Sequence, residues 1–111
     1  MRILWVTNHL FECFLPYVKG KPANDGSWIA PLFYNIKNQQ GVTLGAITSV
    51  IDGEALKKMI NDVAYYCIPI EKNENYRNMN KDLASRYLWA INDFKPDIIH
   101  VHGTERNYGL L

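Results

Sequence analysis

The sequence predicts an α/β protein, part of a doubly wound domain in which a parallel sheet of about four strands carries helices on both faces. Short, continuous apolar runs alternate along the chain with amphipathic segments of helical periodicity. This alternation produces βαβ units, whose strands pair in parallel through right-handed crossovers. We therefore expect one α/β unit over residues 1–111, with its strands in the order 3-2-1-4.

Four segments have the composition of strands. Residues 3–7 (Ile-Leu-Trp-Val-Thr) and 98–101 (Ile-Ile-His-Val) are apolar runs that lack two-residue alternation. In residues 3–7 this pattern indicates a strand that is covered on both faces, as in the centre of a parallel sheet. Residues 42–50 and 63–70 carry the same signal more weakly, and Pro69 is expected to end the second of them.

Two amphipathic helices are expected between the strands. Residues 28–40 place apolar side chains at 3.6-residue spacing, with Ser27 as the N-cap and Gly41 after the last turn. Residues 79–93 carry a second apolar stripe, which Pro96 ends. The remaining segments are expected to form a short helix and a polar loop, over residues 53–62 and 71–78. This succession is typical of a Rossmann-like domain, here a partial one that ends soon after its fourth strand.

Composition and motifs exclude several classes of function. A net charge of +1 provides no basic face for nucleic acid. Cys13 and Cys67 have neither the spacing of a zinc site nor that of a redox pair. A dinucleotide-binding glycine pattern and a phosphate-binding P-loop are both absent after the first strand, which argues against an NAD or FAD enzyme, so no cofactor is expected. No apolar run reaches the roughly 20 residues of a membrane-spanning helix. We expect a cytoplasmic protein.

Ligands of open parallel sheets bind outside the carboxyl ends of the strands, and the long connection after the first strand reaches that edge. It begins at Asn8. Its apolar residues 11–18 either pack against the core as a short helix or arm, or line an acceptor pocket. Gly26 and Ser27 precede a helix, where free backbone N–H groups favour a phosphate. A glycine in this place also serves as a simple turn.

A second segment, residues 100–105, follows the fourth strand to the same edge. His100 and His102 are two residues apart and point to the same side while the strand geometry persists. No third ligand lies nearby in sequence, so a metal site is not expected. We interpret His100 as a buried, hydrogen-bonded residue of the apolar run. His102 would lie at the mouth of the site as a hydrogen-bond donor or proton carrier, with Glu105 close by in sequence.

These segments resemble the family 4 retaining glycosyltransferases. Residues 95–103 (Lys-Pro-Asp-Ile-Ile-His-Val-His-Gly) are similar to the family's Pro-Asp-apolar-apolar-His-x-His segment. Residues 1–8 are similar to its first strand, and residues 25–27 (Asp-Gly-Ser) fall where the family has a glycine-rich turn before a helix. The resemblance covers the whole chain in order, and the histidine segment is its most specific part.

The resemblance implies the acceptor-side, N-terminal domain of a two-domain GT-B enzyme. Such a hexosyltransferase moves a sugar from a nucleotide-sugar donor to an acceptor with retention of configuration. His102 matches the family's active-site histidine, and Gly26 matches the turn that approaches the donor phosphate, although Ser27 stands where the family often has a second glycine. Asn8 and Glu105 complete the candidate donor-phosphate or acceptor contacts. Helix dipoles and basic side chains stabilise the leaving phosphate in such enzymes, so no metal is expected.

The resemblance also implies partners and a limit on activity. The donor is held mainly by a second domain that this chain does not include, so we expect the chain alone to be inactive. The expected partners are a nucleotide sugar and a sugar or glycolipid acceptor, with peripheral contact at the inner face of a membrane. The edge of the fourth strand is expected to pair with another copy, to be covered by a rearranged terminus, or to be partly disordered.

Two other interpretations stay open. A small flavodoxin-like or receiver-type domain would bind a ligand or partner without catalysis. Receiver domains place acidic residues at strand ends that here read Thr7-Asn8 and Ile68-Pro69, which disfavours that type. A different GT-B enzyme, such as an epimerase, would share the two-domain form without transfer to an acceptor.

Overall fold

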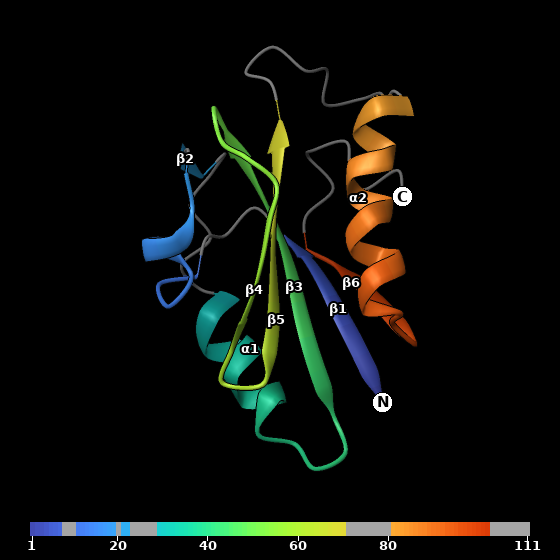
Figure 1. Cartoon of the computed structure of the whole chain (residues 1–111). Helices are drawn as coiled ribbons and strands as arrows, with labels where there is room; N and C mark the ends of the chain where they lie inside the picture. The colour runs from blue at the N-terminus through green and yellow to red at the C-terminus, as the bar shows by residue number, and fades with distance from the viewer. Residues whose placement is uncertain (8–10, 20, 23–28, 71–80, 103–111) are drawn as a thin grey trace.

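The computed structural model describes residues 1–7, 11–19, 21–22, 29–70 and 81–102, and within them strands and helices alternate (Figure 1). The elements in chain order are β1 (Arg2–Thr7), the 3-10 helix η1 (Leu15–Tyr17), β2 (Lys21–Pro22), α1 (Ile29–Lys37), β3 (Thr43–Ile51), β4 (Leu56–Ile60), β5 (Val63–Ile70), α2 (Lys81–Phe94) and β6 (Ile98–Val101). The α/β class is therefore confirmed.

Most elements begin and end close to the residues that the sequence indicates. β6 coincides with the predicted strand, and β1 and β3 differ from theirs by one residue at one or both ends. β5 does not end at Pro69 as expected, because it continues to Ile70, which pairs with Ile51 of β3. α2 ends one residue later than predicted, at Phe94. α1 ends at Lys37, three residues early, and Gly41 adopts a positive φ of 79° in the turn that follows.

The strands form one mixed sheet with the order β4-β5-β3-β1-β6. β1 pairs in parallel with β3 on one side and with β6 on the other, and β3 pairs in parallel with β5. β4 is antiparallel to β5, and the two-residue β2 is antiparallel to the end of β3. The four predicted strands lie in the predicted order 3-2-1-4, as β5-β3-β1-β6, but the strand count and the full order of the sheet differ because β4 and β2 are added.

β4 accounts for most of this difference. The prediction of a short helix over residues 53–62 is wrong, because this segment holds β4 and the turn of a β-hairpin. Asn61 and Asp62 have φ of 50° and 67°, the left-handed backbone that a tight two-residue hairpin turn requires. Lys57 and Lys58 give the edge strand the charge that discourages further pairing.

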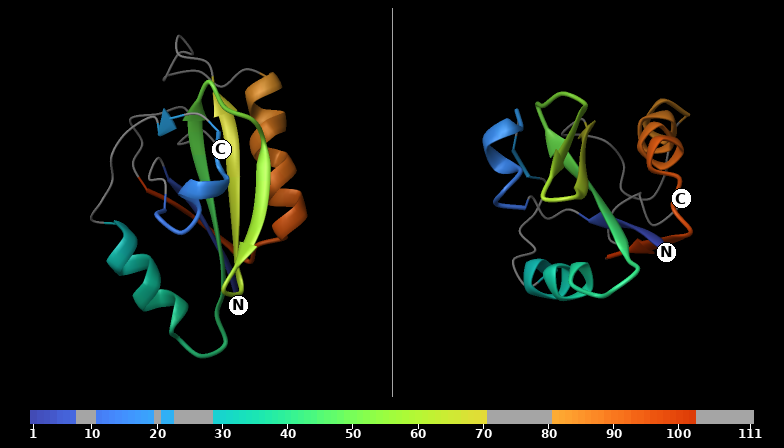
Figure 2. Two further views of the ribbon diagram at one scale, coloured as in Figure 1. Left: turned by 60° about the vertical axis from the view of Figure 1, so that its left-hand side comes forward. Right: turned by 60° about the horizontal axis from the view of Figure 1, so that its bottom comes forward.

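Side chains of β1 alternate between two cores. Leu4 and Val6 pack in the core that α2 covers, whereas Trp5 packs in the core that includes Phe33 of α1. We call these two sides of the sheet the α2 face and the α1 face; Figure 2 shows the helices on opposite sides. Leu4, Trp5 and Val6 are fully buried, so β1 is covered on both faces, as its sequence indicates.

The connection after β1 contributes to the core of the α1 face. Phe11 and Phe14 are fully buried, and the ring of Phe14 stacks on Tyr65 with 5.5 Å between centroids. Leu15 and Tyr17 of η1 remain about half exposed. Of the two interpretations of residues 11–18, packing against the core is therefore what the structure shows.

β6 forms one edge of the sheet within the described residues. Ile98 and Ile99 are 45% and 40% exposed, although they belong to a continuous apolar strand. The expected coverings of this edge involve another copy or the terminus beyond His102, and residues 103–111 lie outside the described residues. Self-association through this edge therefore stays a prediction.

Close packing joins α2 to the centre of the sheet. Gly45 of β3 faces the ring of Phe94, and a Cβ at Gly45 would lie 2.7 Å from a ring carbon of Phe94 and 3.1 Å from a methyl carbon of Leu4. Such distances are too short for a side chain without movement of its neighbours. The missing side chain at Gly45 therefore sets how closely α2 approaches β3.

Gly45→Ala is expected to lower the free energy of unfolding by roughly 1–3 kcal/mol, because the added methyl group overpacks the contact with Phe94. Urea denaturation measures the loss. Phe94→Leu in the same chain should recover part of it, because the clashing ring is removed. Strictly additive losses in the double variant would contradict this contact as the cause.

Candidate functional site

The topology draws attention to the carboxyl ends of β1 and β6. β1 has β3 as its neighbour on one side and β6 on the other. The chain continues from β1 to β3, and it later crosses back from β5 through α2 to reach β6, so the strand order reverses at β1. In parallel α/β sheets the crevice at such a reversal, outside the carboxyl ends of the strands, is where ligands bind.

Buried polar side chains gather at this edge. Within the described part of the chain, the polar residues in the buried class are Thr7, Thr48, Ser49 and His102, each at or just past the carboxyl half of a parallel strand. Thr7 pairs directly with Thr48 across β1 and β3, and the backbone N–H of His102 donates to the carbonyl oxygen of Val6 at 2.9 Å. By strand alternation Ser49 faces the α2 side, whereas Thr7 and Thr48 face the α1 side, where His102 contacts Trp5. The central strands are otherwise apolar, so the polar cluster of Thr7, Thr48 and His102 is a local departure from core composition.

His102 is held in this cluster by aromatic contacts. Its imidazole lies over the indole of Trp5, with 3.8 Å between centroids and 38° between planes, and its centroid is 4.0 Å from that of His100. His102 is only 9% exposed. Burial, followed by the neighbouring His100, lowers the pKa of His102 to about 4. At neutral pH His102 is therefore an uncharged imidazole.

The sequence-predicted site is only partly within the described residues. His102 lies at the carboxyl edge as predicted, whereas Asn8, Gly26, Ser27 and Glu105 lie outside the described residues. The prediction of a buried His100 is wrong: it is exposed, because β6 is an edge strand of the described sheet and leaves part of this side chain open.

Sequence reasoning missed Trp5 and Thr48 of the cluster, and it missed Ser49, which is buried at the same edge on the α2 face. Trp5 was part of an apolar run and carried no separate signal. Thr48 and Ser49 are successive hydroxyl residues inside an otherwise apolar strand, and they lie toward its carboxyl end. Buried hydroxyls at that end of a parallel strand are a signal that could have identified them.

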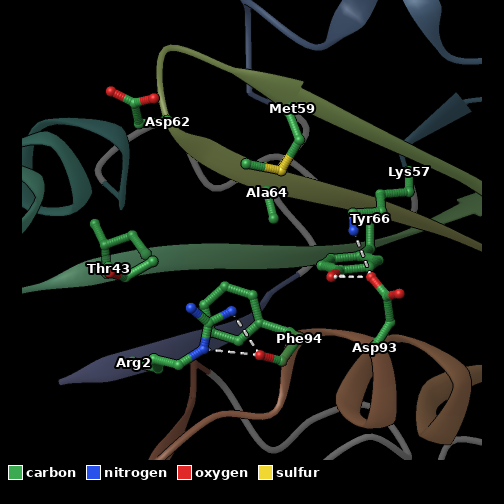
Figure 3. A pocket seen from close by; sticks show the side chains of 10 residues that line it. Arg2, Thr43, Lys57, Met59, Asp62, Ala64, Tyr66, Asp93 and Phe94 are labelled. Carbon is green, nitrogen blue, oxygen red and sulfur yellow. Dashed lines mark hydrogen bonds and ion pairs between the residues drawn. The ribbon is translucent and has the colours of Figure 1, made fainter.

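A cavity of about 220 Å³ lies at the opposite, amino end of the strands, on the α2 face (Figure 3). Lys57 approaches the carboxylate of Asp93 at 2.6 Å, and the Tyr66 hydroxyl donates to the same carboxylate oxygen at 2.7 Å. The Lys57 contact is the first cause of the lowered pKa of Asp93, and burial is the first cause of the raised pKa of Tyr66. These bonds join β4, β5 and the last turn of α2.

Arg2 forms a second link at the same cavity. Its Nε and Nη2 donate to the carbonyl oxygen of Phe94 at 2.9 and 2.7 Å, and its guanidinium lies 4.4 Å from the centroid of the Phe94 ring. A cation at the carboxyl end of a helix satisfies a free carbonyl and the helix dipole. The backbone N–H of Arg2 also donates to Asp97 at 2.8 Å. Lys57 and Asp93 bind each other and the Arg2 guanidinium binds the end of α2, so we interpret the cavity as a structural junction.

The described residues contain no group of three or more His, Cys, Asp or Glu side chains that could hold a metal ion. In the same part of the chain, no helix combines the length and apolar character needed to cross a membrane. Comparison with protein-family models, curated proteins and solved structures found no significant match to this chain. The carboxyl edge is therefore interpreted from its own residues and from the resemblance of the histidine segment.

The fold is expected to lose stability as the pH falls from about 6.5 to about 4. The folded state holds His102 at a pKa of about 4, below the value of about 6.5 in an unfolded chain, so the unfolded state binds more protons in this window. The loss from this residue is on the order of 3 kcal/mol. Urea denaturation across this range should show a smaller loss for His102→Gln. His100→Gln, at an exposed position, should retain the fall of unfolding free energy with falling pH. If that free energy changes equally with pH in the wild type and in His102→Gln, His102 is not the cause.

Tyr66→Phe is expected to lower the free energy of unfolding by about 1 kcal/mol, because it removes one hydrogen bond to a partly exposed carboxylate. Thermal or urea denaturation measures the change. The imidazole NMR signals of His102 should stay unchanged, because the junction lies at the opposite end of the sheet. Unaltered stability, or a shift of the His102 signals, would contradict a purely structural role for this end.

Proposed function

We propose that this chain is the acceptor-side part of a retaining glycosyltransferase of GT-B architecture, and that the carboxyl edge between β1 and β6 forms its share of the sugar-transfer site. The observation that carries the proposal is the buried polar cluster around His102. It coincides with the residue that resembles the active-site histidine of family 4 enzymes, and it lies at the strand reversal where parallel sheets bind ligands.

The chemistry of the cluster favours a sugar as the group bound there. Thr7 and Thr48 carry hydroxyls, and His102 is uncharged at neutral pH. Hydroxyls and a neutral imidazole can both donate and accept hydrogen bonds, which suits the hydroxyl groups of a sugar ring. No buried side chain of the described residues carries the positive charge that would compensate a phosphate.

In the proposed reaction His102 is the catalytic residue that contacts the transferred sugar. A neutral imidazole hydrogen-bonded to a sugar hydroxyl can strengthen that bond as charge develops at the reacting carbon. The free N–H groups at the start of α1, together with Gly26, Ser27 and Asn8, would face the donor phosphate or the acceptor. The donor nucleotide and the basic side chains for the leaving phosphate would belong to a second domain.

The partners and location follow from this role. The donor is a nucleotide sugar, and the acceptor is a sugar or glycolipid. We place the enzyme in the cytoplasm, at the inner face of a membrane where a glycolipid acceptor would be presented.

Sugar transfer by the protein that includes both domains is expected to fall about 100-fold or more in His102→Gln, because one hydrogen bond to the transition state is lost. Tyr66→Phe, at the structural junction, should retain activity and serves as the control. The isolated 111-residue chain should transfer no sugar. Wild-type rates in His102→Gln, or transfer by the isolated chain, would overturn the proposal.

The coding sequence downstream of Leu111 gives an independent test. Further βα units with a Glu-(seven residues)-Glu motif would support the transferase. A stop codon directly after Leu111 would favour a small binding domain without catalysis. Donor epimerisation in place of transfer would instead support a GT-B epimerase.

A further inference from the structure

The residue that most directly contacts His102 is Trp5, from the middle of β1. Trp5 is fully buried, and β1 pairs it with His100 of β6. The indole lies under His102 at 3.8 Å and meets the ring of His100 edge-on at 5.2 Å. On its other side it packs edge-on against Phe33 of α1, also at 5.2 Å between centroids. The indole thus connects the candidate catalytic imidazole to the helix that covers this face.

We propose that Trp5 is a positioning residue, which fixes the orientation of the His102 ring at the carboxyl edge through the contact of its indole with the imidazole. That His102 is the catalytic group rests on the proposed function. That Trp5 orients it is argued from the contacts with β1: Val6 accepts a hydrogen bond from the His102 backbone, and the Trp5 indole contacts the His102 ring.

Core packing alone does not account for a tryptophan at this position. The indole N–H of Trp5 is buried and has no hydrogen-bond acceptor among the described residues. Burying a donor without a partner costs stability, and a leucine or phenylalanine would fill apolar space without that cost. The flat face of an indole offers what those side chains lack, a broad surface that an imidazole ring can lie against. Geometry therefore gives Trp5 a role beyond filling the core.

The same contact excludes water from the imidazole. His100 is the titratable group that faces His102 within the described residues, and Trp5, Thr7 and Thr48 add no charge on this side of β1 and β3. Burial is the larger cause of the low pKa of His102, ahead of His100. A side chain smaller than indole would admit water and reduce that penalty on the charged imidazole.

NMR titration of the imidazole signals of the 111-residue chain tests the proposal without any activity assay. His102→Gln identifies the His102 signals among the three histidines. In the wild type, the ring protons of His102 should be displaced by the ring current of the indole. In Trp5→Leu this displacement should disappear, and the pKa of His102 should rise from about 4 toward about 6.5. Trp5→Phe, which keeps an aromatic face, should restore part of both properties.

Phe14→Leu is the matched control. Phe14 is fully buried in the same core and stacks on Tyr65, so its truncation should lower stability and leave the His102 signals unchanged. An unchanged His102 pKa in folded Trp5→Leu would overturn the proposal. If neither Trp5 variant folds, undisplaced His102 ring protons in the wild type would overturn it equally. A normal response to Trp5 combined with wild-type sugar transfer by His102→Gln would overturn only the proposed function.

Discussion

The rest of the structure depends on the burial of β1 on both faces and along both edges. β3 and β6 occupy its two edges, and the two cores cover Leu4, Trp5 and Val6 completely. A strand enclosed in this way cannot shift its register by one residue, because the shift would exchange the side chains of the two cores. The register of β1 therefore fixes which residues meet at each end of the sheet.

The two ends use polar groups in different ways. At the amino end, Arg2, Lys57 and Asp93 carry charges that are neutralised or hydrogen-bonded by groups of the same junction. These bonds hold the last turn of α2 against β1 and β4. At the carboxyl end the buried groups are neutral hydroxyls and an imidazole of low pKa.

Sequence reasoning recovered the parts of the fold that depend on continuous apolar runs. The runs at residues 3–7 and 63–70 became strands close to the predicted bounds, because burial on both faces leaves no alternation to misread. The run at residues 98–101 also became a strand, although most of its side chains are exposed. β4 was missed because Leu-Lys-Lys-Met-Ile has the apolar spacing of a helical turn as well as that of a strand. This segment becomes a strand because it pairs with β5, and the Asn61-Asp62 turn is the feature of the sequence that indicates the hairpin.

The candidate site shows the same division between local and tertiary information. His102 could be singled out because its spacing and neighbours resemble a known motif, but the burial of His102 and the exposure of His100 depend on where β6 lies in the sheet. The role of Trp5 depends on the pairing of β1 with β6, which places residues nearly one hundred positions apart in contact.

An apolar residue in an apolar run gives no local sign of a function. For Trp5 the indication comes only from the folded structure, in which its buried indole N–H has no acceptor among the described residues and therefore costs stability. In a sequence that otherwise fits its fold, a residue that departs from the usual rules of packing and hydrogen bonding is often found at a functional site. Thr7, Thr48 and Trp5 depart from core composition on the same face of the sheet as His102, and their common position is the strongest physical reason to look for function at that edge.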